Sequence, residues 1–225
     1  MIRAVIFDLD DTLYREWDFV RGGFKVVARH VARLCRARPA DVYRKLLQQY
    51  FLFGRDNTFG RLLKEMRLEG ACDVARLVKI YRNHSPKLRL FDDAKKTLFR
   101  LKEIKCRLGM ITDGDDSVQK NKVAALGIQR YFSSIIYTHE FGVNCYKPNP
   151  FSYNLLAKNL GCSFSDMVYV GDNPEKDFIT AKKLGMVTVR LMRGPFAQVP
   201  ADEEHEAHIR MDSFCGFMDW LAGTG

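Results

Sequence analysis

The sequence predicts an α/β protein built on a parallel β-sheet, with a helical domain inserted after the first strand. Three observations favour this class. Residues 2–8 are almost continuously apolar, residues 16–86 show helical patterns with no strand among them, and from residue 92 onward helix and strand patterns alternate. The chain has 225 residues, which is long enough for a large core domain and a smaller insert.

The first strand and the insert differ in the spacing of their apolar residues. Residues 2–8 read "IRAVIFD", as expected of a strand covered on both faces. In the next segment Val20, Phe24, Val27 and Val31 recur every three or four positions, which is typical of an amphipathic helix. Helices are predicted in the insert over residues 18–35, 39–53, 59–68 and 73–83.

Helices and strands alternate through the rest of the chain. Three of the predicted helices end at Gly127, Gly161 and Gly185, and glycine is the expected residue just past a helix C-terminus. Alternation of this kind predicts parallel strands joined by helical crossovers. Residues 194–208 are predicted to be a loop. The predicted helices are 92–105, 117–126, 150–160, 175–184 and 212–223, and the predicted strands are 107–112, 134–138, 167–170 and 187–191.

The net charge of +9 is concentrated in the insert. Residues 14–90 contain 18 Lys and Arg against 7 Asp and Glu, a balance of +11, and the remainder contains 18 against 20, a balance of −2. A positive field of this kind attracts anions, either a phosphorylated small molecule or a nucleic acid. A set of solvated helix faces is the alternative interpretation.

Composition also bears on location and redox state. No apolar stretch approaches the roughly 18 residues that a membrane span needs, and the first residues lack the features of a secretory signal. We therefore expect a cytoplasmic protein with no membrane partner. The six cysteines include no C-x-x-C pair and no histidine at zinc-finger spacing, so we expect reduced thiols.

Acidic and polar residues follow four of the predicted strands. Ligands of parallel sheets bind outside the carboxyl ends of the strands, so we expect these residues to lie together. Several carboxylates and one lysine suit a hard cation together with a phosphate group. In chain order the residues are Asp8, Asp10, Thr12, Thr112, Asp113, Gly114, Lys147, Asp172 and Asp177.

These residues resemble the motifs of the haloacid dehalogenase-like hydrolase superfamily. The pattern D-x-D-x-T is present at residues 8–12, a strand ends in Thr112, Lys147 precedes a proline, and G-D-x-x-x-x-D occupies residues 171–177. The resemblance covers essentially the whole chain in the expected order, and it implies a Rossmann-like core with a small inserted cap of four helices. It assigns the core to residues 1–14 and 88–225, and the cap to residues 15–87.

The resemblance also implies a Mg²⁺-dependent phosphatase. Asp8 is expected to attack phosphorus and form an aspartyl phosphate, and Asp10 is expected to act as general acid and base. Dehalogenases of this superfamily do not carry the second acid, because a halide leaves without a proton, so Asp10 favours phosphate chemistry. Mg²⁺ is expected to be held by Asp8, Asp172 and the backbone carbonyl of Asp10, with Asp177 placing a bound water. Phosphate oxygens are expected to contact Thr112 Oγ, the backbone N–H groups near Asp113 and Gly114, and Lys147.

The predicted substrate is a small phosphate monoester of the sugar-phosphate or nucleotide class. Two alternatives stay open. Another acceptor could take the phosphoryl group, which would make the protein a phosphotransferase or mutase. The basic insert could instead bind nucleic acid beside a vestigial acidic site, but it shows no recognition-helix pattern, so nucleic acid is not the expected partner. The sequence does not define the oligomeric state.

Overall fold

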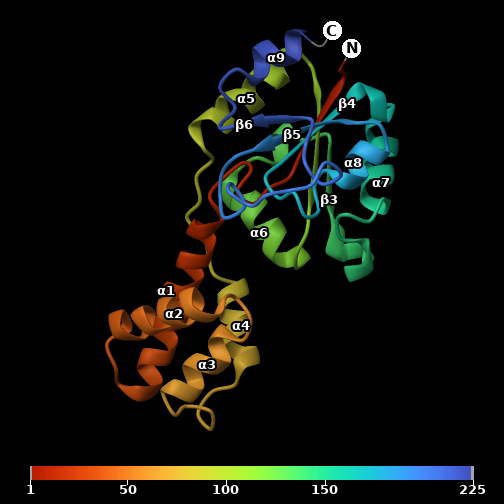
Figure 1. Ribbon diagram of the computed structural model, residues 1–225. Helices are drawn as coiled ribbons and strands as arrows, with labels where there is room; N and C mark the ends of the chain where they lie inside the picture. The colour runs from red at the N-terminus through yellow and green to blue at the C-terminus, as the bar shows by residue number, and fades with distance from the viewer. Residues whose placement is uncertain (1, 224–225) are drawn as a thin grey trace. The chain divides into compact units, whose positions relative to one another are not determined.

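The computed structural model describes residues 2–223, and the chain divides into two units (Figure 1). One unit consists of Met1–Glu16 and Leu88–Gly225, and the other is the segment Trp17–Lys87. The chain therefore leaves the first unit once, forms the helical unit, and returns. That the two units are a catalytic core and a cap stays a prediction.

The first unit is built on a six-stranded sheet whose paired strands are all parallel, in the order β3-β2-β1-β4-β5-β6. This confirms the predicted α/β class with a parallel sheet. The strand β1 lies between β2 and β4, and its burial on both faces explains its continuous apolar sequence. The strands are β1 (Ala4–Phe7), β2 (Arg107–Thr112), β3 (Ser134–Tyr137), β4 (Met167–Gly171), β5 (Val187–Leu191) and β6 (Ile209–Met211).

Helices cover both faces of this sheet. Ile6 and Tyr169 belong to a buried cluster that includes Leu156 of α7, whereas Phe7 points to the opposite face and packs against Phe214, with ring centroids 5.9 Å apart. On that opposite face α5 contacts α9 (Figure 1). The helices of this unit are α5 (Asp92–Glu103), α6 (Asp116–Leu126), α7 (Phe151–Leu160), α8 (Ile179–Lys183) and α9 (Phe217–Gly223).

The C-terminal part of this unit differs from the prediction in two places. The strand β6 was not predicted, because three residues are too few to show a period. The helix predicted over residues 175–184 is shorter, because the chain first makes a turn in which the Asn173 backbone N–H donates to Asp177 Oδ2 at 3.0 Å. The predicted helix over 212–223 is likewise reduced to α9.

The helical unit has a core of its own. Apolar side chains at the predicted helical spacing are buried, including Val27 and Val31 of α1 and Leu77 of α4. The carboxylate of Asp73 caps α4 by accepting from the backbone N–H of Arg76 at 2.6 Å. Among residues 2–223, no helix combines the length and the apolar character that crossing a membrane requires. The helices are α1 (Glu16–Cys35), α2 (Pro39–Phe53), α3 (Thr58–Glu65) and α4 (Val74–Arg82).

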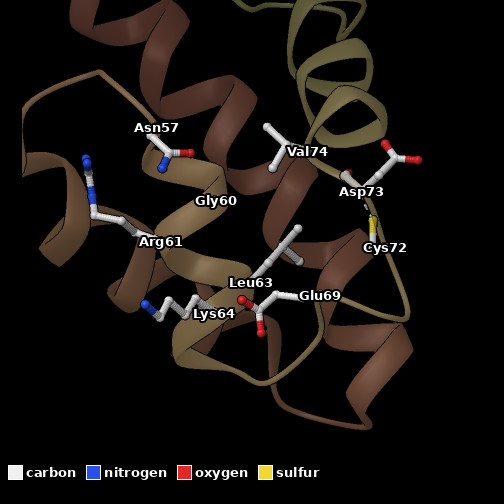
Figure 2. Close-up of a pocket in the computed structure, with 9 residues that line it drawn as sticks. All are labelled: Asn57, Gly60, Arg61, Leu63, Lys64, Glu69, Cys72, Asp73 and Val74. Atoms are coloured by element: carbon white, nitrogen blue, oxygen red, sulfur yellow. Dashed lines mark hydrogen bonds between the residues drawn. The ribbon is translucent and has the colours of Figure 1, made fainter.

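An open cavity of about 440 Å³ lies on the helical unit (Figure 2). Its walls come from α3, the loop that follows and the start of α4, and its charged lining residues are Arg61, Lys64, Glu69 and Asp73. The Arg61 guanidinium also donates to the backbone carbonyl of Gly54 at 3.2 Å. None of the predicted catalytic residues lines this cavity.

Candidate active site

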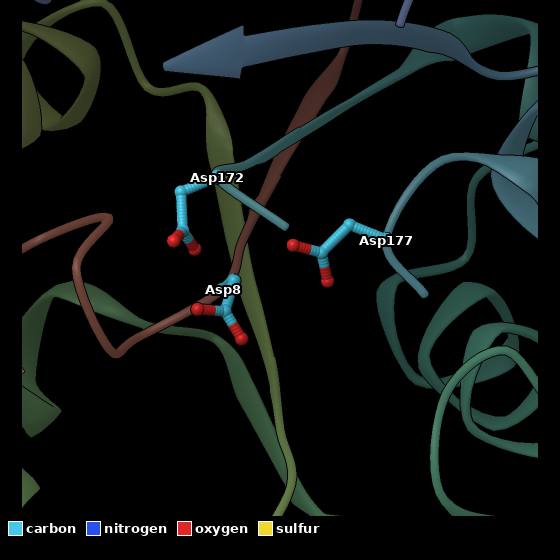
Figure 3. A group of neighbouring side chains, drawn as sticks. All are labelled: Asp8, Asp172 and Asp177. Carbon is cyan, nitrogen blue, oxygen red and sulfur yellow. The ribbon is translucent and has the colours of Figure 1, made fainter. Parts of the chain in front are cut away.

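Three buried carboxylates gather at the carboxyl end of the sheet (Figure 3). Asp8 follows β1 and Asp172 follows β4, and these strands are adjacent and parallel, so the sheet places the two acids together. Asp177 reaches them from the turn before α8. One carboxylate oxygen from each residue lies within 4.8 Å of the others. The structure thus brings together three of the four residues predicted to contact a metal.

Lys147 lies against this acidic cluster. Its ammonium group donates to Asp8 Oδ1 at 2.6 Å, to Asp177 Oδ1 at 2.7 Å and to the Tyr169 hydroxyl at 3.0 Å, and its side chain is fully buried. Burial disfavours the ammonium form, but Asp177 and Asp8 outweigh it and hold the pKa of Lys147 well above its usual value. Lys147 is therefore a cation whose three N–H donors all have acceptors.

One ammonium group does not balance three carboxylates. Burial raises the pKa of Asp8 to about 7, against the opposing effect of Lys147. Burial, followed by the nearby Asp8 and Asp177 carboxylates, raises the pKa of Asp172 well above its usual range. The cluster therefore resists carrying its full negative charge, and a second cation would relieve it.

Asp10 has a different set of partners. Its carboxylate accepts from Lys122 Nζ at 2.8 Å on both oxygens, from the Tyr14 hydroxyl at 2.5 Å and from Gln119 Nε2 at 3.0 Å. Burial raises the pKa of Asp10, but Lys122, Tyr14 and Gln119 together outweigh it and the pKa is lowered. Asp10 is thus an ionised carboxylate that does not belong to the cluster of Asp8.

The loop after β2 brings a hydroxyl and a glycine to the same edge of the sheet. Thr112 is buried at the end of β2, and its Oγ1 accepts from Gln119 Nε2 at 2.5 Å. Gly114 has a φ of 119°, which a residue with a side chain rarely adopts. On the neighbouring loop, the Thr12 hydroxyl donates to Asp172 Oδ1 at 3.3 Å.

The Asp113 side chain joins segments of the core. Its Oδ1 accepts from the Thr138 hydroxyl at 2.9 Å and from the Lys147 backbone N–H at 3.2 Å, and its Oδ2 accepts from Lys176 Nζ at 2.9 Å. Burial raises its pKa, but Lys147 and Lys176 reverse this and lower it. The carboxylate is therefore fully used in holding the loops that carry Lys147 and Lys176, and only the Asp113 backbone is available to a phosphate group.

Several polar residues of this region were not predicted as site residues. Gln119 and Lys122 lie three positions apart on α6 and are both buried, at 1% and 4% exposure. Polar residues on a helix are normally exposed, so their type gives no sign of burial. A signal existed in their spacing, because residues three apart share one helix face. The other unpredicted residues are Tyr14, Tyr169 and Lys176.

Known proteins that resemble this chain over most of its length are hydrolases, and several are named phosphatases. A family model described as haloacid dehalogenase-like hydrolase matches residues 5–191. A glyceraldehyde 3-phosphate phosphatase of Methanocaldococcus jannaschii is 32% identical over 90% of this chain and 90% of its own length. A protein of the same name from Methanopyrus kandleri is 31% identical over 94% of each chain. A phosphoserine phosphatase of Thermus thermophilus is 27% identical over 70% of this chain and 61% of its own.

Solved structures show the same fold. A crystal structure of a HAD phosphatase from Thermococcus onnurineus has a TM-score of 0.66 at 23% identity, and covers 99% of each chain. A 2-haloacid dehalogenase from Pseudomonas syringae pv. Tomato has a TM-score of 0.68 at 20% identity, and covers 100% of each chain. Both structures therefore resemble the two units of this chain in fold.

Proposed function

Because the chain belongs to the haloacid dehalogenase-like hydrolases, we propose that it hydrolyses a small phosphate monoester of the sugar-phosphate class, with Asp8 as the nucleophile. The enzyme class itself is that of a phosphatase, because named phosphatases about 30% identical match most of the chain. The observation that carries the proposal is the buried cluster of Asp8, Asp172 and Asp177 around Lys147.

Asp8 has the surroundings of a nucleophile. Lys147 holds its Oδ1 at 2.6 Å, which restricts the orientation of the carboxylate, and we propose that Oδ2 is the attacking oxygen. A carboxylate oxygen attacks phosphorus, the new O–P bond gives an aspartyl phosphate, and the bond to the ester oxygen breaks with its electron pair leaving on that oxygen. A second acid must then protonate the departing oxygen.

Asp10 is our candidate for that second acid. A protonated Asp10 gives its proton to the leaving oxygen, and the resulting carboxylate then takes a proton from the water that cleaves the aspartyl phosphate. The ionised Asp10 held by Lys122 and Tyr14 corresponds to the form required in the second step. The separate partners of Asp8 and Asp10 support different roles for the two acids.

The acidic cluster fits a hard divalent cation. It offers carboxylate oxygens within 4.8 Å of one another. Burial, together with repulsion between the acids, raises the pKa of Asp8 and Asp172, so a bound cation would favour their ionised forms. We propose that Asp8, Asp172 and the backbone carbonyl of Asp10 hold Mg²⁺, with Asp177 contacting it through water. When bound, Mg²⁺ reduces the repulsion between the Asp8 carboxylate and the phosphate oxygens.

The phosphate oxygens need donors as charge develops. We propose that the Thr112 hydroxyl, the backbone N–H groups at Asp113 and Gly114, and Lys147 supply them. Gly114 supports this role because its positive φ lets the backbone approach a ligand closely. Since all three N–H donors of Lys147 have partners here, contact with a phosphate oxygen requires that it exchange one of them.

We propose that the helical unit, Trp17–Lys87, is the cap of this enzyme. Its support is its position in the chain, between the first strand and the rest of the sheet, and its own buried core. The excess of basic residues in this part of the chain suits an anionic substrate, because a positive field raises the local concentration of anions.

A panel of phosphate esters tests this function. Purified protein with Mg²⁺ is incubated with glyceraldehyde 3-phosphate, other sugar phosphates, phosphoserine and nucleoside monophosphates, and both inorganic phosphate and the released alcohol are measured. We expect equal amounts of the two products from at least one sugar phosphate, and none from the Asp8→Asn variant. Alcohol in excess of phosphate would indicate transfer to another acceptor, and no release from any ester would refute the proposal.

A further inference from the structure

The helix α6 presents two buried polar side chains to Asp10. Lys122 Nζ lies 2.8 Å from both oxygens of the Asp10 carboxylate, and Gln119 Nε2 lies 3.0 Å from Oδ2. The two residues are three positions apart and therefore share one face of the helix. From the loop after β1, the Tyr14 hydroxyl donates to Oδ1. Each carboxylate oxygen thus accepts two hydrogen bonds.

Stability alone does not account for Lys122. Removing an ammonium group from water is costly, and a buried ion pair often contributes less to stability than apolar residues of the same volume. Lys122 is nevertheless 4% exposed, while its partner Asp10 keeps 23% of its side chain exposed and Glu16 lies 3.9 Å away. A buried cation facing a partly accessible carboxylate points to a role in holding that carboxylate.

Gln119 ties Asp10 to the loop after β2. Its single amide nitrogen donates to Asp10 Oδ2 and also to Thr112 Oγ1 at 2.5 Å, so both of its N–H groups are used. The Gln119 side chain also lies 3.6 Å from the position that a β-carbon on Gly114 would occupy. One side chain therefore bridges Asp10 and the loop of Thr112 and Gly114.

We propose that Lys122 and Gln119 are positioning residues that hold Asp10 where it can pass its proton to the leaving oxygen of a phosphate monoester. Lys122 contacts both oxygens and so restricts rotation of the carboxylate, and Gln119 fixes its place relative to Thr112. This inference rests on the proposed function, because it assumes that Asp10 is the acid and base.

The role has a kinetic signature that a purely structural role lacks. A poorly stabilised leaving group, such as an alkoxide, depends on a well-placed acid, whereas p-nitrophenolate leaves readily without a proton. General acid catalysis contributes about 10²- to 10⁴-fold, so misplacing Asp10 removes part of this factor for alkyl esters only. The quantity to compare is kcat/KM, which reports the steps up to release of the leaving group.

The experiment compares two variants of the same helix. Lys122→Met removes the buried ammonium group, and Lys120→Met is the control, because Lys120 is exposed and pairs with Asp116 and Glu140 at the surface. We expect Lys122→Met to lower kcat/KM about 100-fold for an alkyl phosphate that the wild type hydrolyses and less than about 5-fold for p-nitrophenyl phosphate. Lys120→Met is expected to change neither by more than about 2-fold.

Other outcomes separate the possible failures. Equal losses on both esters would show that Lys122 serves only the folded structure and would overturn the inference. If Lys122→Met does not fold by circular dichroism, Gln119→Leu decides in its place, with the same selective loss expected. A wild type inactive on both esters refutes the proposed function, whereas an Asp10→Asn variant with no selectivity for alkyl esters refutes the role of Asp10 itself.

Discussion

Replacing Asp8 with asparagine should stabilise the metal-free protein above neutral pH. Burial raises the pKa of Asp8 to about 7 in the folded chain, from 3.8 in the absence of the fold. Between these two pH values the folded protein binds more protons than the unfolded one, so the free energy of unfolding falls as pH rises. Asparagine carries no charge at any of these pH values and still offers Lys147 an oxygen.

The size of the effect follows from the two pKa values. They differ by about 3, and each tenfold change in proton affinity corresponds to about 1.4 kcal/mol. The shifted titration of Asp8 therefore destabilises the folded protein by about 2 kcal/mol at pH 5, where the folded carboxyl is still protonated and the unfolded one is ionised, and by about 4 kcal/mol at pH 8. For a chain of this size, each kcal/mol moves the thermal midpoint by about 2–4 °C.

Urea unfolding followed by tryptophan fluorescence compares the free energy of unfolding of the wild type and Asp8→Asn in the core unit. Trp220 lies in α9 of that unit, and Trp17 lies in the helical unit, so a Trp17→Phe background leaves one reporter. Both proteins are unfolded in EDTA at pH 5 and pH 8. We expect Asp8→Asn to be the more stable protein, with an advantage that grows by about 2 kcal/mol between the two pH values.

Two outcomes would refute the expected gain in stability of Asp8→Asn. An advantage that does not change with pH would mean that Asp8 does not titrate in this range. A less stable Asp8→Asn protein at pH 8 would mean that the ion pair with Lys147 outweighs the burial and the repulsion from the other two acids. An isosteric control, Asp92→Asn, changes an acid at the start of α5, outside the buried cluster, and should not reproduce the gain in stability of Asp8→Asn.

Three further predictions concern the metal, the phosphate loop and the tail. Mg²⁺ at a hundred times its dissociation constant should raise the free energy of unfolding of the wild type in urea by about 2.7 kcal/mol. An equal rise in the Asp172→Asn variant would contradict our metal site. Gly114→Ala should cost about 1–3 kcal/mol in urea unfolding because its φ is 119°, and should lower kcat; unchanged values would contradict this. Arg190→Met should cost about 3 kcal/mol while kcat is kept, because Arg190 is buried against Glu206 and two backbone carbonyls; a drop in kcat with no loss of stability would oppose it.

The sequence was informative about the sheet and about the residues that follow its strands. Buried parallel strands give continuous apolar runs, and their carboxyl ends meet at one edge, so the approach of Asp8 to Asp172 could be predicted from two local patterns. The same reasoning placed Lys147 near them, although its loop is irregular. The roles of these residues in catalysis stay predictions.

Two buried side-chain contacts between distant segments, away from the ends of the predicted strands, were not predicted. The pairing of Lys122 with Asp10 joins α6 to the loop after β1. The spacing of Gln119 and Lys122 places them on one helix face, but only the contact with Asp10 shows that this face is buried while Lys120 is exposed. The segment before β6 is joined to β5 by Arg190, which donates to Glu206 and is buried despite its charge. In both cases the partner, and not the residue type, decides burial.

The two buried lysines of the site pair with different acids, Lys122 with Asp10 and Lys147 with Asp8 and Asp177. Lys122 contacts both oxygens of Asp10 and balances the charge of its carboxylate, so that side chain needs no further cation. Lys147 forms ion pairs with Asp8 and Asp177, and Asp172 belongs to the same cluster. Three carboxylates therefore lie near one ammonium group. Two negative charges remain when all three acids are ionised, which is the charge that one divalent cation balances. The lysines therefore confine cation affinity to the cluster around Asp8 and leave Asp10 free for proton transfer, and this separation lets one edge of the sheet carry both an ion site and an acid.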